Sequence, residues 1–411
     1  MTGRIAGGCG EVRRPEPDCQ FCFDQRMNKS RLQELRELVD RDTGGTVLSV
    51  FVRTDPRDPE NSSEHPGWTI SLKNGIREAI AAIEPGHESH QAALKLAAEA
   101  ERRLQSASAA ERGRSVALFL GADGSIDEFH TFQIPVRQGY VTFDSGPVVW
   151  PMVDVIDRGQ RTGIVLMSND HIRLLEWFDG NAHDIEASTY DLELGDWKDY
   201  RGAARANPTR GQQSVVNTDA FKDRVKVWRN KFTKDSAVSI AEAAEDLDFE
   251  RLIVCADGEL GTGFEAAVPD SLRERLIDIV PVNLIDQSAN EVADHLDERL
   301  REDWRKSVGE VAEQALSRVK AADRGTGGPD ETLLALSEGR VSHLIFDPYL
   351  ETKADTLSDG AREAIEAAGE ASIQEALVEL ALRTDARISS ASVEEVPALA
   401  ETGGILALLR Y

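Results

Sequence analysis

The sequence Ala203-Ala-Arg-Ala-Asn-Pro-Thr-Arg-Gly-Gln-Gln-Ser214 is a polar stretch, and a long helical pattern follows it. Ten Lys and Arg and three Asp lie between Lys198 and Lys234, about +7 in a chain whose formal net charge is -26. Clustered cations are the electrostatic footprint of nucleic-acid binding. A solvated charged helix face is the alternative, but it does not explain the basic residues of the loop. The stretch therefore predicts a loop directed at a polyanion. Its cations are Lys198, Arg201, Arg205, Arg210, Lys222, Arg224, Lys226, Arg229, Lys231 and Lys234.

Length and composition indicate a globular protein of several domains. A chain of 411 residues exceeds what one core usually holds, so about two to four domains are expected. No apolar run approaches the ~20 residues that span a bilayer, and residues 1–24 lack the apolar core of a secretory signal. We therefore expect a cytoplasmic protein without a membrane partner, whose acidity favours solubility.

Cysteines are few, and three of the four lie near the N-terminus. Cys19 and Cys22 have the spacing of half a zinc site, but no second Cys pair or His pair follows them. A metal at this half-site is the alternative to a disordered leader over residues 1–29 with incidental cysteines. We expect the leader, no metal and no cofactor.

Hydrophobic patterns predict three consecutive α/β domains. The first, residues 30–158, alternates helical segments with β-branched runs such as Thr46-Val-Leu-Ser-Val-Phe-Val-Arg53. Expected helices are 30–42, 70–83 and 88–106, and expected strands are 46–53, 115–121, 129–135 and 140–143.

The middle domain, residues 159–286, begins with a predicted β-hairpin, residues 163–168 and 171–178, turned at Asn169-Asp170. A third strand over 183–190, the basic loop and a helix over about 218–247 follow. This order, with later strands at 251–256 and 277–283 and a helix at 269–276, predicts a ribonuclease-H-like sheet.

The third domain, residues 287–411, starts with a helix that Ser288 caps, with Glu291 completing a capping box. We expect this helix to run to about Ala322. Short helices and strands alternate after it, which is typical of a three-layer α/β/α domain.

Common catalytic motifs are missing from the chain. The eight histidines are scattered, without a nucleophile elbow or His-Glu-x-x-His. Residues 258–263 contain glycines but no Lys-Ser/Thr, so they predict a turn, and His343 inside an apolar strand predicts a core residue. A cluster of aspartates indicates a solvated loop face, with a magnesium nuclease site as the alternative: Asp184, Asp191, Asp196 and Asp199.

The remaining candidate for chemistry is Arg210-Gly-Gln-Gln-Ser214. Glycine lets a backbone approach a substrate closely. A glutamine amide or a backbone N–H can orient a water molecule without titrating. A Gly-Gln tip on such a loop therefore suits a reaction in which acidic side chains would be a liability.

This stretch resembles the middle domain of the archaeal and eukaryotic class-1 release factor and Pelota superfamily, in its bacterial/archaeal branch. There a basic Arg-Gly-Gly-Gln-Ser loop precedes a helix rich in Arg and Lys, to which Phe221–Lys234 is similar. Thr402-Gly-Gly-Ile-Leu-Ala-Leu-Leu-Arg-Tyr411 is similar to the strand that ends the family's third domain. The resemblance covers about residues 160–411 and implies an L7Ae-like C-terminal fold.

One departure concerns the tripeptide itself, because Gln212 stands where the family has its second glycine. In release factors the tripeptide enters the peptidyl transferase centre and promotes hydrolysis of peptidyl-tRNA. A side chain at this position restricts the backbone and adds bulk. Gln212 could also be the reactive glutamine in a shifted register, but the following Ser214 favours Gln213. Stop-codon motifs of the eukaryotic factors are missing from the first domain, so codon-specific termination is not expected.

The resemblance implies a monomeric translation factor that binds the ribosomal A site, rRNA and peptidyl-tRNA, with a translational GTPase as a further partner. The first hypothesis is peptidyl-tRNA hydrolysis in ribosome rescue or quality control, with Gly211, Gln212 and Gln213 as the catalytic tripeptide. The second is a hibernation factor that occupies the A site without catalysis. The third is an RNA-binding or RNA-cleaving protein acting off the ribosome. Expected RNA contacts are Arg205, Arg210, Ser214, Lys222, Arg224, Lys226 and Arg229.

Overall fold

The computed structural model describes residues 27–41, 43–84, 88–168, 171–185, 214–350, 356–368 and 372–411. The chain divides into two compact units. One includes Val165–Leu174 and Ile185–Asn283, and the other contains Arg31–Ile164, Leu175–Asp184 and Leu284–Tyr411. The second unit therefore combines an N-terminal part, from Arg31, with the C-terminal part of the sequence. The expected boundaries of three domains remain a prediction, because this division into two units does not test them.

The N-terminal part of the second unit is built on a four-stranded sheet in the order β3-β2-β1-β4. Its strands are β1 (Val47–Arg53), β2 (Ser115–Gly121), β3 (Asp127–Phe132) and β4 (Tyr140–Asp144), and β1 pairs antiparallel with both β2 and β4. Six of the seven residues of β1 and of β2 are buried, as the continuous apolar runs predicted. The sheet is therefore covered on both faces.

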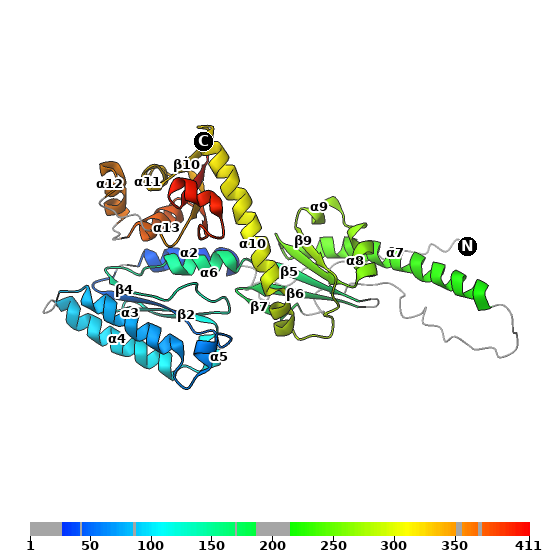
Figure 1. Cartoon of the computed structure of the whole chain (residues 1–411), viewed down its shortest axis with the longest axis horizontal. Helices are drawn as coiled ribbons and strands as arrows, with labels where there is room; N and C mark the ends of the chain where they lie inside the picture. The colour runs from blue at the N-terminus through cyan, green and yellow to red at the C-terminus, as the bar shows by residue number, and fades with distance from the viewer. Residues whose placement is uncertain are drawn as a thin grey trace, which may run out of the picture. The chain divides into compact units, whose positions relative to one another are not determined.

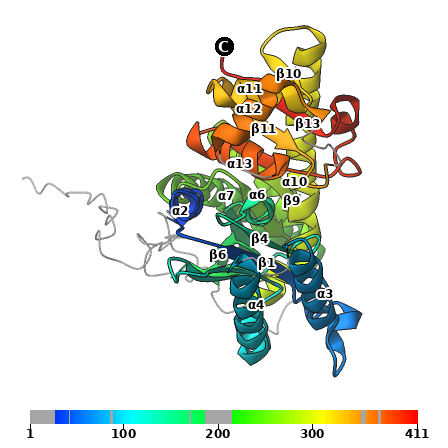
Figure 2. The same cartoon turned by 90° about the vertical axis from the view of Figure 1, so that its left-hand side faces the viewer.

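Helices provide this cover. On one face, α3 (Gly67–Ala81) and α4 (Glu88–Ser106) bury Trp68, Leu72 and Ala100 against the strands. Figure 1 shows α2 (Met27–Val39) and α6 (Trp150–Arg158) on the opposite face, and Figure 2 shows α3 and α4 from the end. A short helix α5 (Ala109–Arg112) and a 3₁₀ turn η1 (Pro59–Ser62) complete this part.

The middle sheet has the order β7-β6-β5-β8-β9. Its strands are β5 (Thr162–Met167), β6 (Ile172–Phe178), β7 (Asn181–Asp184), β8 (Leu252–Ala256) and β9 (Leu276–Val280). The pair β6–β7 is antiparallel and the pair β8–β9 is parallel. Phe232, Phe249 and Phe264 fill the core beside β8, together with the helices α7 (Ser214–Asp246), α8 (Gly258–Glu265) and α9 (Asp270–Arg273).

The C-terminal part begins with α10 (Ala289–Lys320), where both hydrogen bonds of the predicted capping box between Ser288 and Glu291 are present. Its sheet has the order β10-β13-β11-β12, with β11 parallel to β12 and antiparallel to β13. Its elements after α10 are β10 (Gly325–Gly327), α11 (Pro329–Ser337), β11 (Val341–Phe346), α12 (Asp359–Ala368), α13 (Ile373–Arg383), β12 (Arg387–Ser390), η4 (Pro397–Thr402) and β13 (Ile405–Leu409).

The geometry of the chain explains the C-terminal Gly-Gly pair. Gly403 and Gly404 have φ values of 63° and 85°, a region that side chains disfavour. A Cβ on Gly404 would lie 2.5 Å from Leu350 Cδ2, whereas a Cβ on Gly403 would meet nothing within 4 Å. Backbone conformation therefore requires both glycines, and close packing requires only the second.

The α/β prediction is confirmed, and most predicted elements occur within a few residues of their expected bounds. Two predictions were wrong. The turn expected at residues 258–263 is helix α8, because the Asp257 side chain accepts a hydrogen bond from Leu260 N at 3.0 Å and caps it. Helix α7 begins at Ser214, four residues before its predicted start. The names ribonuclease-H-like and L7Ae-like remain predictions.

Candidate nucleic-acid interface

The predicted Gly-Gln loop lies outside the described residues. This applies to Arg205, Arg210, Gly211, Gln212 and Gln213. Ser214 is the first residue of α7, and the backbone of Lys222, Arg224 and Lys226 lies in the same helix. Their side chains also lie outside the description. The candidate interface is therefore described by the backbone of α7 and by the side chain of Arg229 within it.

Helix α7 extends well beyond the core that anchors it. Among the side chains described, the face of α7 that packs into the core begins at Phe232 and includes Ala237, Ile240 and Ala244. Eighteen residues separate Ser214 from Phe232, which is a reach of about 27 Å at ~1.5 Å per residue. Val227, within this segment, is 71% exposed. Figure 1 shows the helix continuing past α8, so the end nearest Gln213 projects from its own unit.

Charge is segregated along α7. Residues 214–234 contain six cations and two aspartates, whereas residues 235–246 contain four acidic residues and no cation. The first turn has no acidic residue and the last has no basic one. A helix macrodipole favours the opposite arrangement, with acids at the N-terminus and cations at the C-terminus. The observed order of charges therefore stabilises the helix less, and it leaves the projecting N-terminal end suited to binding an anion.

Arg229 is the only predicted contact whose side chain the structure describes, and it pairs with Glu259 in the first turn of α8. The Glu259 side chain is 81% exposed. Exposed ion pairs typically contribute about 0–1 kcal/mol. A phosphate could therefore replace Glu259 as the partner of Arg229 at small cost.

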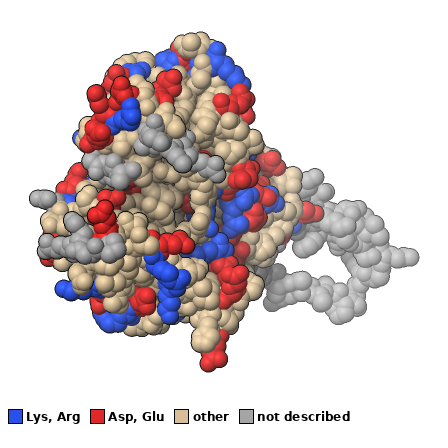
Figure 3. Space-filling model, turned by 60° about the vertical axis from the view of Figure 1, so that its left-hand side comes forward, with Lys and Arg blue, Asp and Glu red and all other residues tan. Residues whose placement is uncertain are grey.

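No second continuous basic area is visible on the face drawn in Figure 3, where Lys and Arg lie interspersed with Asp and Glu. In the described ranges, ion pairs already hold many of the arginines, including Arg53 with Asp58, Arg114 with Asp55 and Arg301 with Asp297. In the sequence, residues 214–234 carry six cations against two aspartates, in a chain whose formal net charge is -26.

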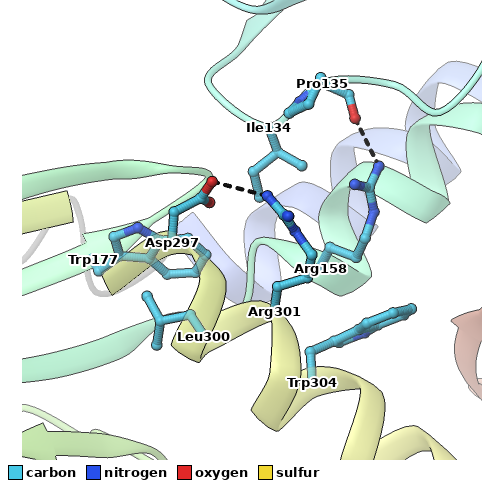
Figure 4. A pocket seen from close by; sticks show the side chains of 8 residues that line it. All are labelled: Ile134, Pro135, Arg158, Trp177, Asp297, Leu300, Arg301 and Trp304. Atoms are coloured by element: carbon cyan, nitrogen blue, oxygen red, sulfur yellow. Dashed lines mark hydrogen bonds and ion pairs between the residues drawn. The ribbon is translucent and has the colours of Figure 1, made fainter. Parts of the chain in front are cut away.

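A pocket in the second unit contains two tryptophans and two arginines (Figure 4). Trp177 and Trp304 are 3% and 2% exposed. Arg158 donates to Pro135 O at 3.0 Å and to Asp154 at 2.7 Å, and Arg301 pairs with Asp297 at 2.9 Å. Both cations are already paired, so the lining does not indicate an anion site. It is formed by Ile134, Pro135, Arg158, Trp177, Asp297, Leu300, Arg301 and Trp304.

Sequence analysis missed a buried polar chain near this pocket. Trp304 Nε1 donates to Asp157 at 2.9 Å, Ser389 Oγ donates to the same carboxyl at 3.3 Å, and His343 Nε2 lies 3.0 Å from Ser389 Oγ. Burial and the charge of Arg387 lower the pKa of His343 to about 4, so this histidine is neutral at pH 7. Ser389 is only 2% exposed, so this row of hydrogen bonds has a structural role.

Metal and membrane features were sought in the same described ranges. No cluster of three or more His, Cys, Asp or Glu there could hold a metal ion. No helix there combines the length and apolar character needed to cross a bilayer. Cys255 is buried in β8, and the predicted half-site Cys19 and Cys22 lies outside the description.

Comparison with known proteins identifies the middle of the chain. Residues 147–301 match the model described as bacterial archaeo-eukaryotic release factor family 10. The match includes the whole basic stretch and α7, and it confirms the resemblance for this part of the sequence. A search among curated proteins gave no match.

Solved structures give weak global superpositions. Archaeal translation termination factor aRF1 aligns over 94% of this chain and 98% of its own, with 16% identity and a TM-score of 0.23. A chain of a model of ribosome-bound archaeal Pelota and ABCE1 aligns over 93% and 94%, with 12% identity and a TM-score of 0.36. Dom34 of S. cerevisiae, a translation termination-like factor that interacts with Hbs1, aligns over 72% and 84%, with 12% identity and a TM-score of 0.36.

Proposed function

Since residues 147–301 are release-factor-like, we propose that this protein is a cytoplasmic translation factor that binds the ribosomal A site and hydrolyses peptidyl-tRNA in ribosome rescue. The observation that carries the proposal is the projecting, basic N-terminal part of α7, which begins directly after Gln213. Such a helix can place the Gly-Gln tip at an RNA-bound ester while its cations contact phosphates.

The division of roles follows from the residue types. Gln213 orients the attacking water through its amide, which does not titrate. Gly211 allows the backbone to pass close to RNA. Phosphate contacts hold the helix in position without reading sequence. These contacts are assigned to Arg205, Arg210, Ser214, Lys222, Arg224, Lys226 and Arg229.

Partners follow from the same proposal. The protein acts as a monomer, and its third region, after residue 286, meets a translational GTPase or the base of the ribosomal stalk. The first region contacts the decoding side of the A site. No cofactor takes part, because the proposed water attack needs only the amide and the RNA-bound ester.

Gln212 favours a second candidate function. A glutamine in place of the family's second glycine adds bulk at the point of closest approach to RNA. A factor that fills the A site of idle ribosomes without hydrolysis, a hibernation factor, would tolerate this change. The two functions share binding and differ in release.

The test is peptide release from ribosomes that carry peptidyl-tRNA and an empty A site. We expect wild type to release peptide and Gln213→Ala to lose about 10²-fold or more, as misplacing a reactant typically does. Gln212→Gly, which restores the family tripeptide, serves as the matched variant and should release at least as fast as wild type.

Tight binding without release by wild type, with release gained in Gln212→Gly, would establish the hibernation factor. Release that Gln213→Ala leaves unchanged would refute the assigned role of Gln213. Absence of both ribosome binding and release would overturn the proposed function altogether.

A further inference from the structure

Helix α6 lacks a cap from its own sequence neighbourhood. Its N-cap residue is Val149, whose side chain offers no hydrogen bond. Glu375 of α13 supplies the cap instead. Its carboxylate oxygens lie 2.9 and 3.0 Å from Val149 N, and Oε2 lies 3.1 Å from Trp150 N. These first amides of a helix have no partner within the helix, so a residue 226 positions away satisfies them.

The Glu375 carboxyl is buried among further acids. Glu375 is 1% exposed. The charged neighbours that act on it most strongly are Glu379, one turn along α13, and Asp144 at the end of β4. Tyr140 of β4 stacks edge-on against Trp150 with ring centroids 5.2 Å apart. Burial first, and then these two carboxylates, raise the pKa of Glu375 to about 8 against the lowering effect of the two backbone bonds.

The other charged groups of α6 are engaged elsewhere. Asp154 pairs with Arg137 at 2.9 Å and with Arg158 at 2.7 Å. Asp157 accepts from Trp304 and Ser389. The cations of α6 and its surroundings are therefore held by acids other than Glu375, which leaves the proton as the means of neutralising this carboxyl.

The rest of the junction combines apolar and polar contacts. Helix α6 packs against α13 and β12, and Met152 and Val153 of α6 and Leu377 and Val378 of α13 are each at most 1% exposed. Arg137 donates to Ser390 O at 3.1 Å and pairs with Glu395, and Trp304 and Ser389 reach Asp157. The apolar core against α3 and α4 draws on residues 48–143, and the core around Trp304 draws on residues 304–408. Release of the first turn of α6 alone would break hydrogen bonds that water can replace, and would leave both of these cores intact.

We propose that Glu375 is a proton-operated latch: while it carries a proton, its carboxyl holds the first turn of α6 against α13, and loss of that proton to solvent releases this turn. The ionised carboxyl would be buried beside Glu379 and Asp144, and opening returns its charge to water. The inference concerns a different part of the chain from the proposed hydrolysis and does not depend on it.

Amide hydrogen exchange of the full-length protein tests the latch. Protection factors for the segment from residue 149 to residue 158, which remove the intrinsic pH dependence of exchange, are measured from about pH 6.5 to about pH 9.5. We expect wild type to lose protection around pH 8. Glu375→Gln should stay protected throughout, because its amide oxygen accepts the same N–H bonds and does not ionise.

Two further variants separate the latch from general alkaline loosening. Glu379→Gln removes a charge that raises the pKa of Glu375. The carboxyl of Glu375 then ionises more readily, so its loss of protection should move to lower pH. Glu363→Gln on the exposed face of α12 should behave as wild type.

Protection that persists in wild type to the highest pH would overturn the latch. Loss of amide protection in Glu375→Gln at the same pH as in wild type would also overturn it. If Glu375→Gln fails to fold, the direction of the Glu379→Gln shift still decides.

Discussion

Neutralising three cations of α7 should reduce the salt dependence of ribosome binding. Lys222→Gln, Arg224→Gln and Lys226→Gln together remove three of the six cations of residues 214–234. Each phosphate contact contributes about 0.7–0.9 to the slope of log affinity against log salt. If all three residues contact phosphate, the slope should fall by about 2–3. Between about 50 mM and 200 mM salt, wild type would then lose about 20- to 40-fold more affinity than the variant.

Co-sedimentation with ribosomes over a salt series measures the slope. The control neutralises three exposed acids in the C-terminal half of the same helix, Asp235→Asn, Glu242→Gln and Glu245→Gln. It changes the net charge by the same amount in the opposite direction, yet it removes no phosphate contact, so its slope should equal that of wild type. An unchanged slope in the cation variant would refute the placement of α7 against RNA. Slope changes of equal size and opposite sign in the two variants would reduce the effect to net charge.

Two further predictions concern stability. Gly404→Ala should destabilise the protein more than Gly403→Ala. Both substitutions place a side chain at positive φ, which costs about 1–2 kcal/mol each, but only alanine at position 404 would also be too close to Leu350. Urea unfolding that ranks the two variants the other way would contradict this packing. The second concerns pH: Glu375 has a folded-state pKa of about 8 against the ordinary 4.5, so its contribution to stability is complete below pH 4.5 and is lost as pH rises through 8. Wild type should therefore lose a few kcal/mol of unfolding free energy over this window, whereas Glu375→Gln should not; identical pH profiles for the two would count against a buried, protonated Glu375.

Local signals in the sequence predicted local structure well. Ser288 and Glu291 stand at the spacing of a capping box, and α10 begins there. The β-branched run before Arg53 forms β1. Where a prediction failed, a single cap decided the outcome: glycines at 258 and 261 suggested a turn, but Asp257 stabilises a helix over them. A helix can also start without a predicted cap, as α7 does at Ser214.

Long-range pairings were beyond sequence reasoning. Nothing near Val149 indicates that Glu375 will cap α6, because hydrogen bonds between residues so far apart leave no periodic pattern. The same holds for Trp304 and Asp157, which are 147 positions apart. The tripeptide Gly211–Gln213 was singled out by resemblance, and its catalytic role stays a prediction. Segregation of charge along α7 is visible in the sequence once the helix bounds are known.

The cap on α6 also determines when, during synthesis of the chain, this helix can be completed. Val149 and Glu375 are 226 positions apart, so at ~5–20 residues per second a ribosome needs roughly 10–45 s to make the second after the first. During that interval the first amides of α6 have only water as a partner. The second compact unit extends from Arg31 to Tyr411, so it closes only after residues near Tyr411 have been made. Completion of α6 in a nascent chain therefore depends on a residue in the last quarter of the sequence.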